Sequence, residues 1–284
     1  MRDEGTVHQL ELKAAEMRLQ IIRMLGADKV HHFGGSLSEA DIVTALYFYK
    51  MRYDPANPTW PERDRFIMSK GHSVPAQYVA LAMLGVFCLD ELSTLKKLGS
   101  RLQGHPAMHL TPGIEGCTGA LGEGLSYANG IALGGRLQGL HFRVYCLIGD
   151  GELHEGQVWE AAMTTAQRRL DNIVAIIDRN RLKAMDASDG PKVLDPLAER
   201  WRTFGWVVRE IDGHNMSAIM DALDWAEQQN DQPSLVIANT IKGKGVSFIE
   251  GQAAYHNAPI NPDQLARALI ELESNLHLLA EAQL

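Results

Sequence analysis

Short apolar runs alternate with segments of helical periodicity along most of this 284-residue chain. The apolar runs predict strands at residues 65–69, 144–148, 173–177, 206–211 and 234–240. The periodic segments predict helices at residues 9–24, 39–51, 76–84, 92–98, 126–137, 157–169, 197–204, 216–228 and 262–279. Such alternation is typical of a doubly wound α/β fold, in which helices cover both faces of a mostly parallel sheet.

Three connecting segments carry expectations of their own. Residues 31–39 predict a loop, with Ser36 and Glu39, or Ser38 alone, capping the helix that follows. That helix is apolar almost all round, so we expect it to be buried. Residues 186–197 predict an exposed loop, and residues 111–124 form a long loop so rich in glycine that its backbone is suited to lie against a ligand.

Length and composition narrow the class of protein. A chain of 284 residues with 45% hydrophobic composition forms one large domain or two small ones, and the absence of a linker or repeat favours one domain over residues 1–284. A net charge of −8 argues against a nucleic-acid partner or an anionic membrane. No apolar run of membrane length and no signal-peptide pattern is present, so we expect a cytoplasmic protein. The isolated cysteines Cys88, Cys117 and Cys146 predict neither disulfides nor a zinc site.

Polar side chains stand at the carboxyl ends of two predicted neighbouring strands. Asp150, within Gly149-Asp150-Gly151, ends one strand, and Asn180 follows the next. Both therefore face one crevice at the edge where parallel sheets bind ligands. Their hard oxygens suit Mg²⁺ or Ca²⁺ better than zinc. Taken alone, the Asp-Gly pair is equally an ordinary turn.

Histidines and lysines add candidate chemistry. Histidines in glycine-flanked loops at element boundaries are His32, His72, His105 and His256. Any one of them alone reads most simply as a surface or structural histidine, but the shared setting points to a common site. Lys242, after the last strand, offers a point charge for phosphate, although it and Lys244 would also fit a solvated turn.

Several motifs together resemble one family from end to end. They are GGSLSEADIVTALY, SKGH, QGHP, TPGIE, TGALGEGLSYANGIAL, GDGELHEGQVWEA and TIKGKGVSF, together with the Asn that follows GDG at the appropriate gap. The chain resembles the amino-terminal, diphosphate-binding half of transketolase, a thiamine-diphosphate enzyme. The resemblance implies transfer of a two-carbon glycolaldehyde unit from a ketose phosphate to an aldose.

The resemblance also implies roles for individual residues. The metal would be held by Asp150, Asn180 and the backbone carbonyl of Leu182. The histidines His32, His72, His105 and His256 would line the channel where sugar meets cofactor. Cofactor contacts would come from His72, Gly119, Leu121, Gly151, Glu155, Asn180, Lys242 and His256.

Glu155 and Glu160 follow the GDG motif at a predicted helix start. Acidic residues there are ordinary partners of the helix dipole. The resemblance implies more: a buried acid cluster across a subunit interface, in which like charges share a proton.

The pyrimidine-binding half of transketolase has no counterpart in this sequence. The resemblance therefore implies a split enzyme, inactive alone and completed by a separate carboxy-terminal polypeptide, as an α2β2 heterotetramer acting on sugar phosphates in pentose-phosphate metabolism or on unusual sugars. Departures from the family pattern are His31 for Gly, Ala120 for Pro, Arg179 before Asn180, Tyr255 for Trp and Asn257 for Gly. They leave the metal and diphosphate ligands intact but put the sugar in doubt. Two rivals stay open: the α subunit of a 2-oxo acid dehydrogenase and a non-catalytic binding protein.

Overall fold

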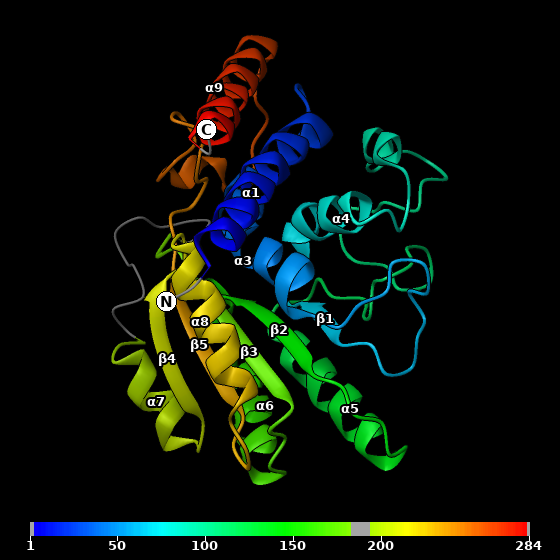
Figure 1. Cartoon of the computed structure of the whole chain (residues 1–284), viewed down its shortest axis with the longest axis vertical. Coiled ribbons are helices and arrows are strands. Elements are labelled where there is room, and N and C mark those ends of the chain that lie inside the picture. The colour runs from blue at the N-terminus through cyan, green and yellow to red at the C-terminus, as the bar shows by residue number, and fades with distance from the viewer. Residues whose placement is uncertain (1–2, 183–193, 283–284) are drawn as a thin grey trace.

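The computed structural model describes residues 3–182 and 194–282. A parallel sheet forms its centre, with the strand order β1-β2-β3-β5-β4 (Figure 1). The strands are β1 (Arg65–Met68), β2 (Val144–Gly149), β3 (Ile173–Arg179), β4 (Val207–Asp212) and β5 (Ser234–Asn239). The predicted α/β fold with a parallel sheet is confirmed.

Helices cover both faces of the sheet, and each face has its own core. One core packs strand side chains against α1 (Glu4–Leu25), α3 (Ala40–Ala45), α4 (Val74–Met83) and α8 (Met216–Glu227). The other packs them against α5 (Gly124–Leu137), α6 (Gly156–Gln167) and α7 (Leu197–Thr203). Side chains of β2 alternate accordingly, because Tyr145 enters the first core and Cys146 the second.

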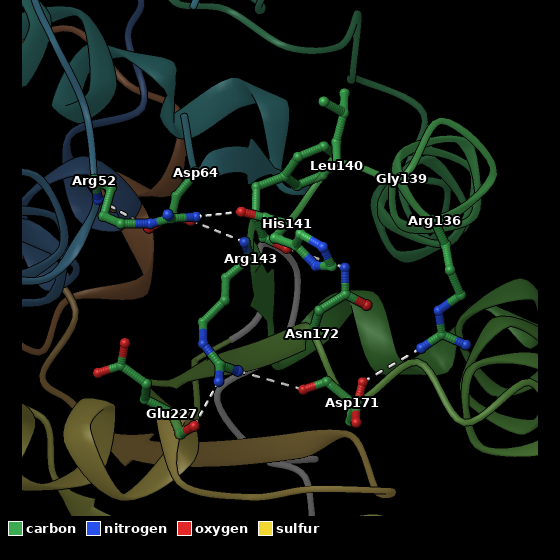
Figure 2. Close-up of a pocket in the computed structure, with 11 residues that line it drawn as sticks. Arg52, Asp64, Arg136, Gly139, Leu140, His141, Arg143, Asp171, Asn172 and Glu227 are labelled. Atoms are coloured by element: carbon green, nitrogen blue, oxygen red, sulfur yellow. Dashed lines mark hydrogen bonds and ion pairs between the residues drawn. The ribbon is translucent and has the colours of Figure 1, made fainter. Parts of the chain in front are cut away.

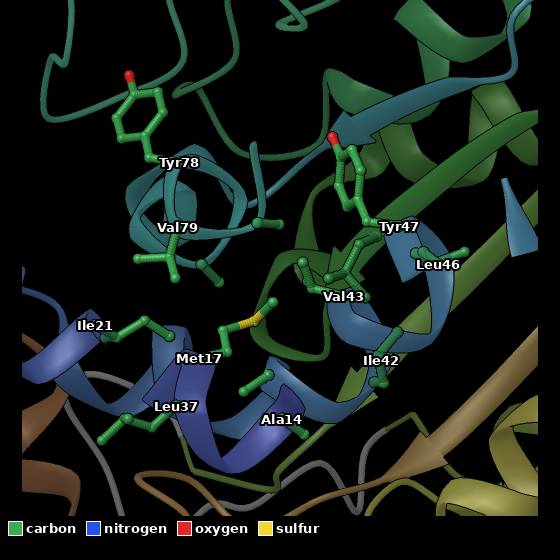
Figure 3. Close-up of a cluster of buried hydrophobic side chains, with 14 of the residues drawn as sticks. Ala14, Met17, Ile21, Leu37, Ile42, Val43, Leu46, Tyr47, Tyr78 and Val79 are labelled. Atoms are coloured by element: carbon green, nitrogen blue, oxygen red, sulfur yellow. The ribbon is translucent and has the colours of Figure 1, made fainter. Parts of the chain in front are cut away.

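The first core includes the region where the amino-terminal helices meet. Figure 3 shows Met17 of α1 directed toward the space between α3 and α4, where Val43 and Val79 lie. These side chains are fully buried. The expectation that the helix at 39–51 is buried therefore holds for its first two turns, although the structure divides it into α3 and a π-helical turn, η1 (Leu46–Lys50).

The expected loop at 31–39 is wrong, since residues Phe33–Ser38 form helix α2. The glycines there allow close packing: a Cβ at Gly34 would lie 2.8 Å from side-chain carbons of Lys242. The expected caps are also wrong. The hydroxyl of Ser36 donates to the carbonyl of His32, and Ser38 and Glu39 are buried in side-chain contacts with other segments.

Two further expectations are affected by the structure. In place of the helix predicted at 92–98, the structure has a 3-10 segment, η3 (Leu89–Thr94), followed by irregular chain. The predicted exposed loop at 186–197 lies mainly outside the described residues.

The carboxy-terminal segment packs against the amino-terminal helices, although the two are distant in sequence. Helix α9 (Pro262–Glu281), which begins with a capping box between Asn261 and Gln264, packs along α1 (Figure 1). Before it, an antiparallel bridge joins His31 to Ala258. The 3-10 segment η6 (Ala253–His256), which precedes the bridge, therefore packs against α2.

None of the helices in residues 3–182 and 194–282 is long and apolar enough to cross a membrane.

Candidate active site

A cavity of about 540 Å³ opens at the carboxyl ends of β1, β2, β3 and β5. It gathers nearly every residue that the sequence singled out. The predicted residues on its wall are His32, His72, His105, Gly119, Leu121, Asp150, Gly151, Asn180, Leu182, Lys242 and His256. Glu155 and Glu160 are not among the lining residues.

The oxygen atoms predicted to bind a metal lie on this wall. The carboxylate of Asp150 accepts hydrogen bonds from the backbone N–H groups of Gly151, at 2.7 Å, and Arg181. Burial, together with the nearby Asp178 carboxylate, raises the pKa of Asp150 to about 6. The side-chain oxygen of Asn180 accepts from the N–H of Leu182 at 3.2 Å. One carboxylate, one amide oxygen and one carbonyl form a donor set that suits a hard cation with open positions for phosphate oxygens.

A cation at this wall would depend on amide and carbonyl oxygens. Within the described parts of the chain, no group of three or more His, Cys, Asp or Glu side chains could hold a metal ion.

Three imidazole rings that line the same cavity form a cluster. The ring centroids of His32 and His72 are 4.7 Å apart, and His256 lies 5.5 Å from His32 and 5.3 Å from His72. Burial is the main cause that lowers the pKa of His32 and of His256 to about 4 and that of His72 to about 2, and neighbouring cations and imidazoles add to it. The pKa of His105 is also lowered, by burial and by Lys96. All four rings are therefore neutral near pH 7.

Lys242 connects the imidazole cluster to the oxygen-lined wall. Its ammonium group donates to the carbonyl of Leu182 at 2.8 Å and lies 2.9 Å from Nδ1 of His256. Because a lysine ammonium only donates, Nδ1 of His256 accepts, and the neutral ring carries its proton on Nε2. Burial lowers the pKa of Lys242 to about 8.

Glycines leave room beside the polar groups. Gly151 lines the cavity, and a Cβ there would meet no atom within 4 Å other than those of its chain neighbours, so open space lies beside this residue. A Cβ at Gly71 would lie 2.5 Å from the carbonyl oxygen of Thr118. The glycine-rich loop therefore packs directly against the end of β1. Gly119 lies beside the ring of His105. The prediction that this loop lies against a ligand site agrees with its position.

A buried charged network centred on Lys70, which also lines the cavity, was missed by the sequence analysis. Lys70 is 3% exposed and forms ion pairs with Asp178 and with Glu39, the latter at 2.7 Å. Burial outweighs this ion pair and raises the pKa of Glu39 to about 8. The available signal was a charged residue at the end of each buried apolar run, since Lys70 and Asp178 follow such runs.

Glu152 is a second buried carboxylate that the sequence analysis missed. It accepts hydrogen bonds from the hydroxyl of Ser69 and from the backbone N–H groups of Gly122 and Gly149. It therefore ties the glycine-rich loop to the ends of β1 and β2. Glu152 follows the GDG motif directly and belongs to no hydrophobic repeat, so the sequence did not indicate that it is buried.

Glu155 and Glu160 are exposed on α6 and its amino-terminal cap. Glu155 lies beside Gly122, where an added Cβ would come within 2.7 Å of its own Cβ. Within this chain they form no buried cluster, so the predicted acid pair stays a prediction about an assembly.

A second cavity, of about 520 Å³, lies at the amino ends of the strands (Figure 2). Arg52, Arg136 and Arg143 extend around it, and Arg143 donates to the backbone carbonyls of Asp171 and Glu227. It contains none of the predicted site residues. The first cavity is therefore the candidate active site.

Comparison with known proteins identifies the family. The sequence profile for "Transketolase, thiamine diphosphate binding domain" matches residues 14–276. The chain belongs to the transketolase family. Among curated relatives, the 6-deoxy-6-sulfo-D-fructose transketolase subunit SqwG of Clostridium sp. is 44% identical, over 93% of this chain and 96% of that protein. An apulose-4-phosphate transketolase subunit of Phocaeicola vulgatus is 41% identical, over 96% of this chain and 97% of that protein.

Full-length transketolases match the same region. Human transketolase is 36% identical over 95% of this chain but only 42% of its own length. The crystal structure of transketolase from Campylobacter jejuni superposes with a TM-score of 0.84 at 30% identity, over 93% of this chain and 43% of that one. This chain thus spans less than half of the solved transketolases. It is a transketolase-type transferase subunit that corresponds to the amino-terminal, thiamine-diphosphate-binding subunit of a split transketolase.

Proposed function

We propose that this chain binds thiamine diphosphate through a divalent cation and, with a separate carboxy-terminal subunit, transfers a two-carbon ketol unit from a ketose phosphate to an aldose. The observation that carries the proposal is the single cavity that joins Asp150, Asn180 and Leu182 to Lys242 and the imidazole cluster. A parallel sheet presents such a cavity at the carboxyl ends of its strands, where cofactors bind.

The oxygen-lined wall would hold the cation and the diphosphate. The carboxylate of Asp150, the side-chain oxygen of Asn180 and the carbonyl of Leu182 would bind Mg²⁺ or Ca²⁺. Lys242 would place a positive charge against phosphate, and Gly151 would let the backbone approach it. Gly119, Leu121, His72 and His256 would complete the contacts, while Glu155, outside the cavity, would act from its edge.

The imidazole cluster would handle the substrate's protons. Thiamine diphosphate supplies, when bound, the carbanion that attacks a ketose carbonyl. His32 and His256 would then hydrogen-bond the reacting oxygens of the sugar, with His72 and His105 orienting it. Neutral imidazoles suit this work, because a neutral ring has one donor and one acceptor nitrogen; in His256 the acceptor Nδ1 is occupied by Lys242, so its Nε2–H would donate to a sugar oxygen.

A partner subunit would complete the site. Relatives that match this chain over nearly their whole length are named as subunits. We propose an α2β2 assembly in which the described residues form one diphosphate-binding domain, and in which Glu155 and Glu160, exposed here, face the partner. A cytoplasmic location and a role in pentose-phosphate metabolism stay predictions.

The identity of the sugar is a narrower question. Two relatives are named for 6-deoxy-6-sulfo-D-fructose and apulose-4-phosphate. We therefore propose a ketose with an anionic group far from its carbonyl as the donor, a phosphate or a sulfonate. An assay of the reconstituted complex with ketose phosphates and a sulfonated ketose would rank them.

Calorimetry on the reconstituted complex tests the proposal. Thiamine diphosphate should bind when Mg²⁺ is present and bind far more weakly after chelation of the metal. Asp150→Ala should abolish the metal-dependent part of the affinity, because it removes the only charged ligand of the proposed set. Affinity that is indifferent to both metal and Asp150 would contradict the proposed site.

A further inference from the structure

Asp178 collects hydrogen bonds from four side chains, three on other segments of the site and one, Asn180, two residues further along its own segment. It sits at the end of β3, is fully buried, and pairs in register with Gly149 of the GDG motif. One carboxylate oxygen accepts from Ser38 at 2.6 Å and from Asn180 at 3.1 Å, and also from Lys70. The other oxygen accepts from Thr240.

The contact with Asn180 determines which way that side-chain amide faces. A carboxylate accepts hydrogen bonds but does not donate them, so only the NH₂ group of Asn180 can face Asp178. The amide oxygen is then turned to the other side, where it accepts from the N–H of Leu182 at 3.2 Å. If the amide were reversed, its NH₂ group would face the cation and its oxygen would face a carboxylate.

We propose that Asp178 is a positioning residue that holds the amide of Asn180 with its oxygen toward the divalent cation. This inference rests on the proposed function, because it assigns Asn180 to the metal. Groups that orient a metal ligand are part of the site even though they do not touch the metal.

The surroundings fix Asp178 as a hydrogen-bond acceptor. The hydroxyl of Ser38 and the Lys70 ammonium donate to one of its oxygens and the hydroxyl of Thr240 donates to the other, so donors surround the whole carboxylate. Its partners come from α2 and from the ends of β1 and β5, so the orientation of one amide is linked to the packing of the whole sheet edge.

An isosteric change separates this role from simple packing. Asp178→Asn keeps the shape but puts an amide at position 178 that donates as well as accepts, so the amide of Asn180 is no longer held one way. We expect the Mg²⁺ concentration for half-maximal binding of thiamine diphosphate, measured by calorimetry on the reconstituted complex, to rise about 10- to 100-fold. The matched control is Thr240→Val, which removes another donor to the same carboxylate and leaves the contact with Asn180. It should lower the melting temperature and shift the Mg²⁺ requirement less than about threefold.

A reciprocal swap keeps the test decisive if Asp178→Asn folds poorly. In the double variant Asp178→Asn, Asn180→Asp, the amide at 178 donates to the carboxylate at 180, which keeps a second oxygen for the cation. Its Mg²⁺ requirement should return to within a few-fold of wild type. The inference is overturned if Asp178→Asn needs no more Mg²⁺ than Thr240→Val, or if the folded double variant fails to bind Mg²⁺ with the cofactor. Wild-type protein that binds the cofactor without a metal would instead refute the proposed function itself.

Discussion

The ammonium of Lys242 donates a hydrogen bond to the backbone carbonyl oxygen of Leu182 across 2.8 Å. The contact joins the segment after β5 to the segment after β3, which are 60 residues apart in sequence. Lys242 is only 2% exposed, and its aliphatic stem packs against Gly34 of α2. A buried cation beside a proposed metal ligand is placed to meet phosphate as well.

Replacing Lys242 should weaken cofactor binding without unfolding the protein. Lys242→Met keeps most of the aliphatic stem and removes the charge, so we expect at least a tenfold loss of thiamine-diphosphate affinity at saturating Mg²⁺, since charge-assisted hydrogen bonds are worth about 1.5–3 kcal/mol. Titration calorimetry measures it. Lys244→Met is the control, because Lys244 is partly exposed and paired with Glu250. Equal losses of affinity in the two variants would show that Lys242 does not contact the cofactor.

Adding one methyl group at Gly151 should fill cofactor space and nothing else. A Cβ there meets no protein atom within 4 Å, and the residue lacks a positive φ. We expect Gly151→Ala to change the free energy of unfolding by less than about 0.5 kcal/mol, while thiamine-diphosphate affinity falls at least tenfold.

The control for this variant is Gly134→Ala, within α5, where an added Cβ also meets no protein atom. It should stabilise the helix by about 0.5–1 kcal/mol and leave binding unchanged. An unaltered affinity in Gly151→Ala would show that the cofactor does not bind beside this residue.

The sequence was sufficient for the strands and for the residues at their ends. Apolar runs gave each strand within about two residues, and the rule that parallel strands present ligands at their carboxyl ends placed Asp150 and Asn180 together. His256 could not be placed this way, because its position depends on the bridge between His31 and Ala258, which no local pattern announces.

Long-range packing explains the errors. Glycines made residues 31–39 resemble a loop, but Gly34 lies in helix α2, where the absence of a Cβ leaves room for the side chain of Lys242. Ser38 and Glu39 resembled caps, yet their partners, Asp178 and Lys70, are distant in sequence. Patterns within a window of a few residues carry no information on such contacts.

Acid should destabilise the protein through its imidazole cluster. The pKa values of His32 and His256 are about 4 and that of His72 is about 2, all below the ordinary 6.5. Between pH 6.5 and 4 the unfolded chain binds these protons and the folded chain does not, so stability is lost as pH falls through that window. Denaturant unfolding at pH 7, 6 and 5 should show this decline.

Removing one member of the cluster should make the decline shallower. His72→Asn eliminates the imidazole with the lowest pKa, so its free energy of unfolding should fall less between pH 7 and 5 than that of wild type. His277→Asn is the control, because His277 is 73% exposed. The explanation fails if both variants keep the wild-type slope.

The titration of Glu39 should change stability in the opposite direction, so that stability is lost as pH rises. Burial is the largest cause that raises its pKa, Lys70 offsets part of that, and the Asp178 carboxylate adds to it, giving a value of about 8 against an ordinary 4.5. A carboxyl group whose pKa is raised on folding stabilises the folded state below pH 4.5, and this contribution is lost as pH rises through about 8. Glu39→Gln cannot ionise and does not lose it. The difference in unfolding free energy between variant and wild type should therefore shift in favour of the variant from pH 5.5 to pH 8, with a slope approaching about 1 kcal/mol per pH unit.

Taking the difference between two proteins removes the titrations that they share, including those of the imidazole cluster, so Glu39 alone determines the slope. Glu273→Gln serves as the matched control, because Glu273 forms an exposed ion pair with Arg23 and its side chain is 52% accessible. That variant should differ from wild type by a constant amount at every pH. A constant difference for Glu39→Gln as well would mean that Lys70 keeps Glu39 ionised throughout, and that the ammonium satisfies both of its carboxylates at once.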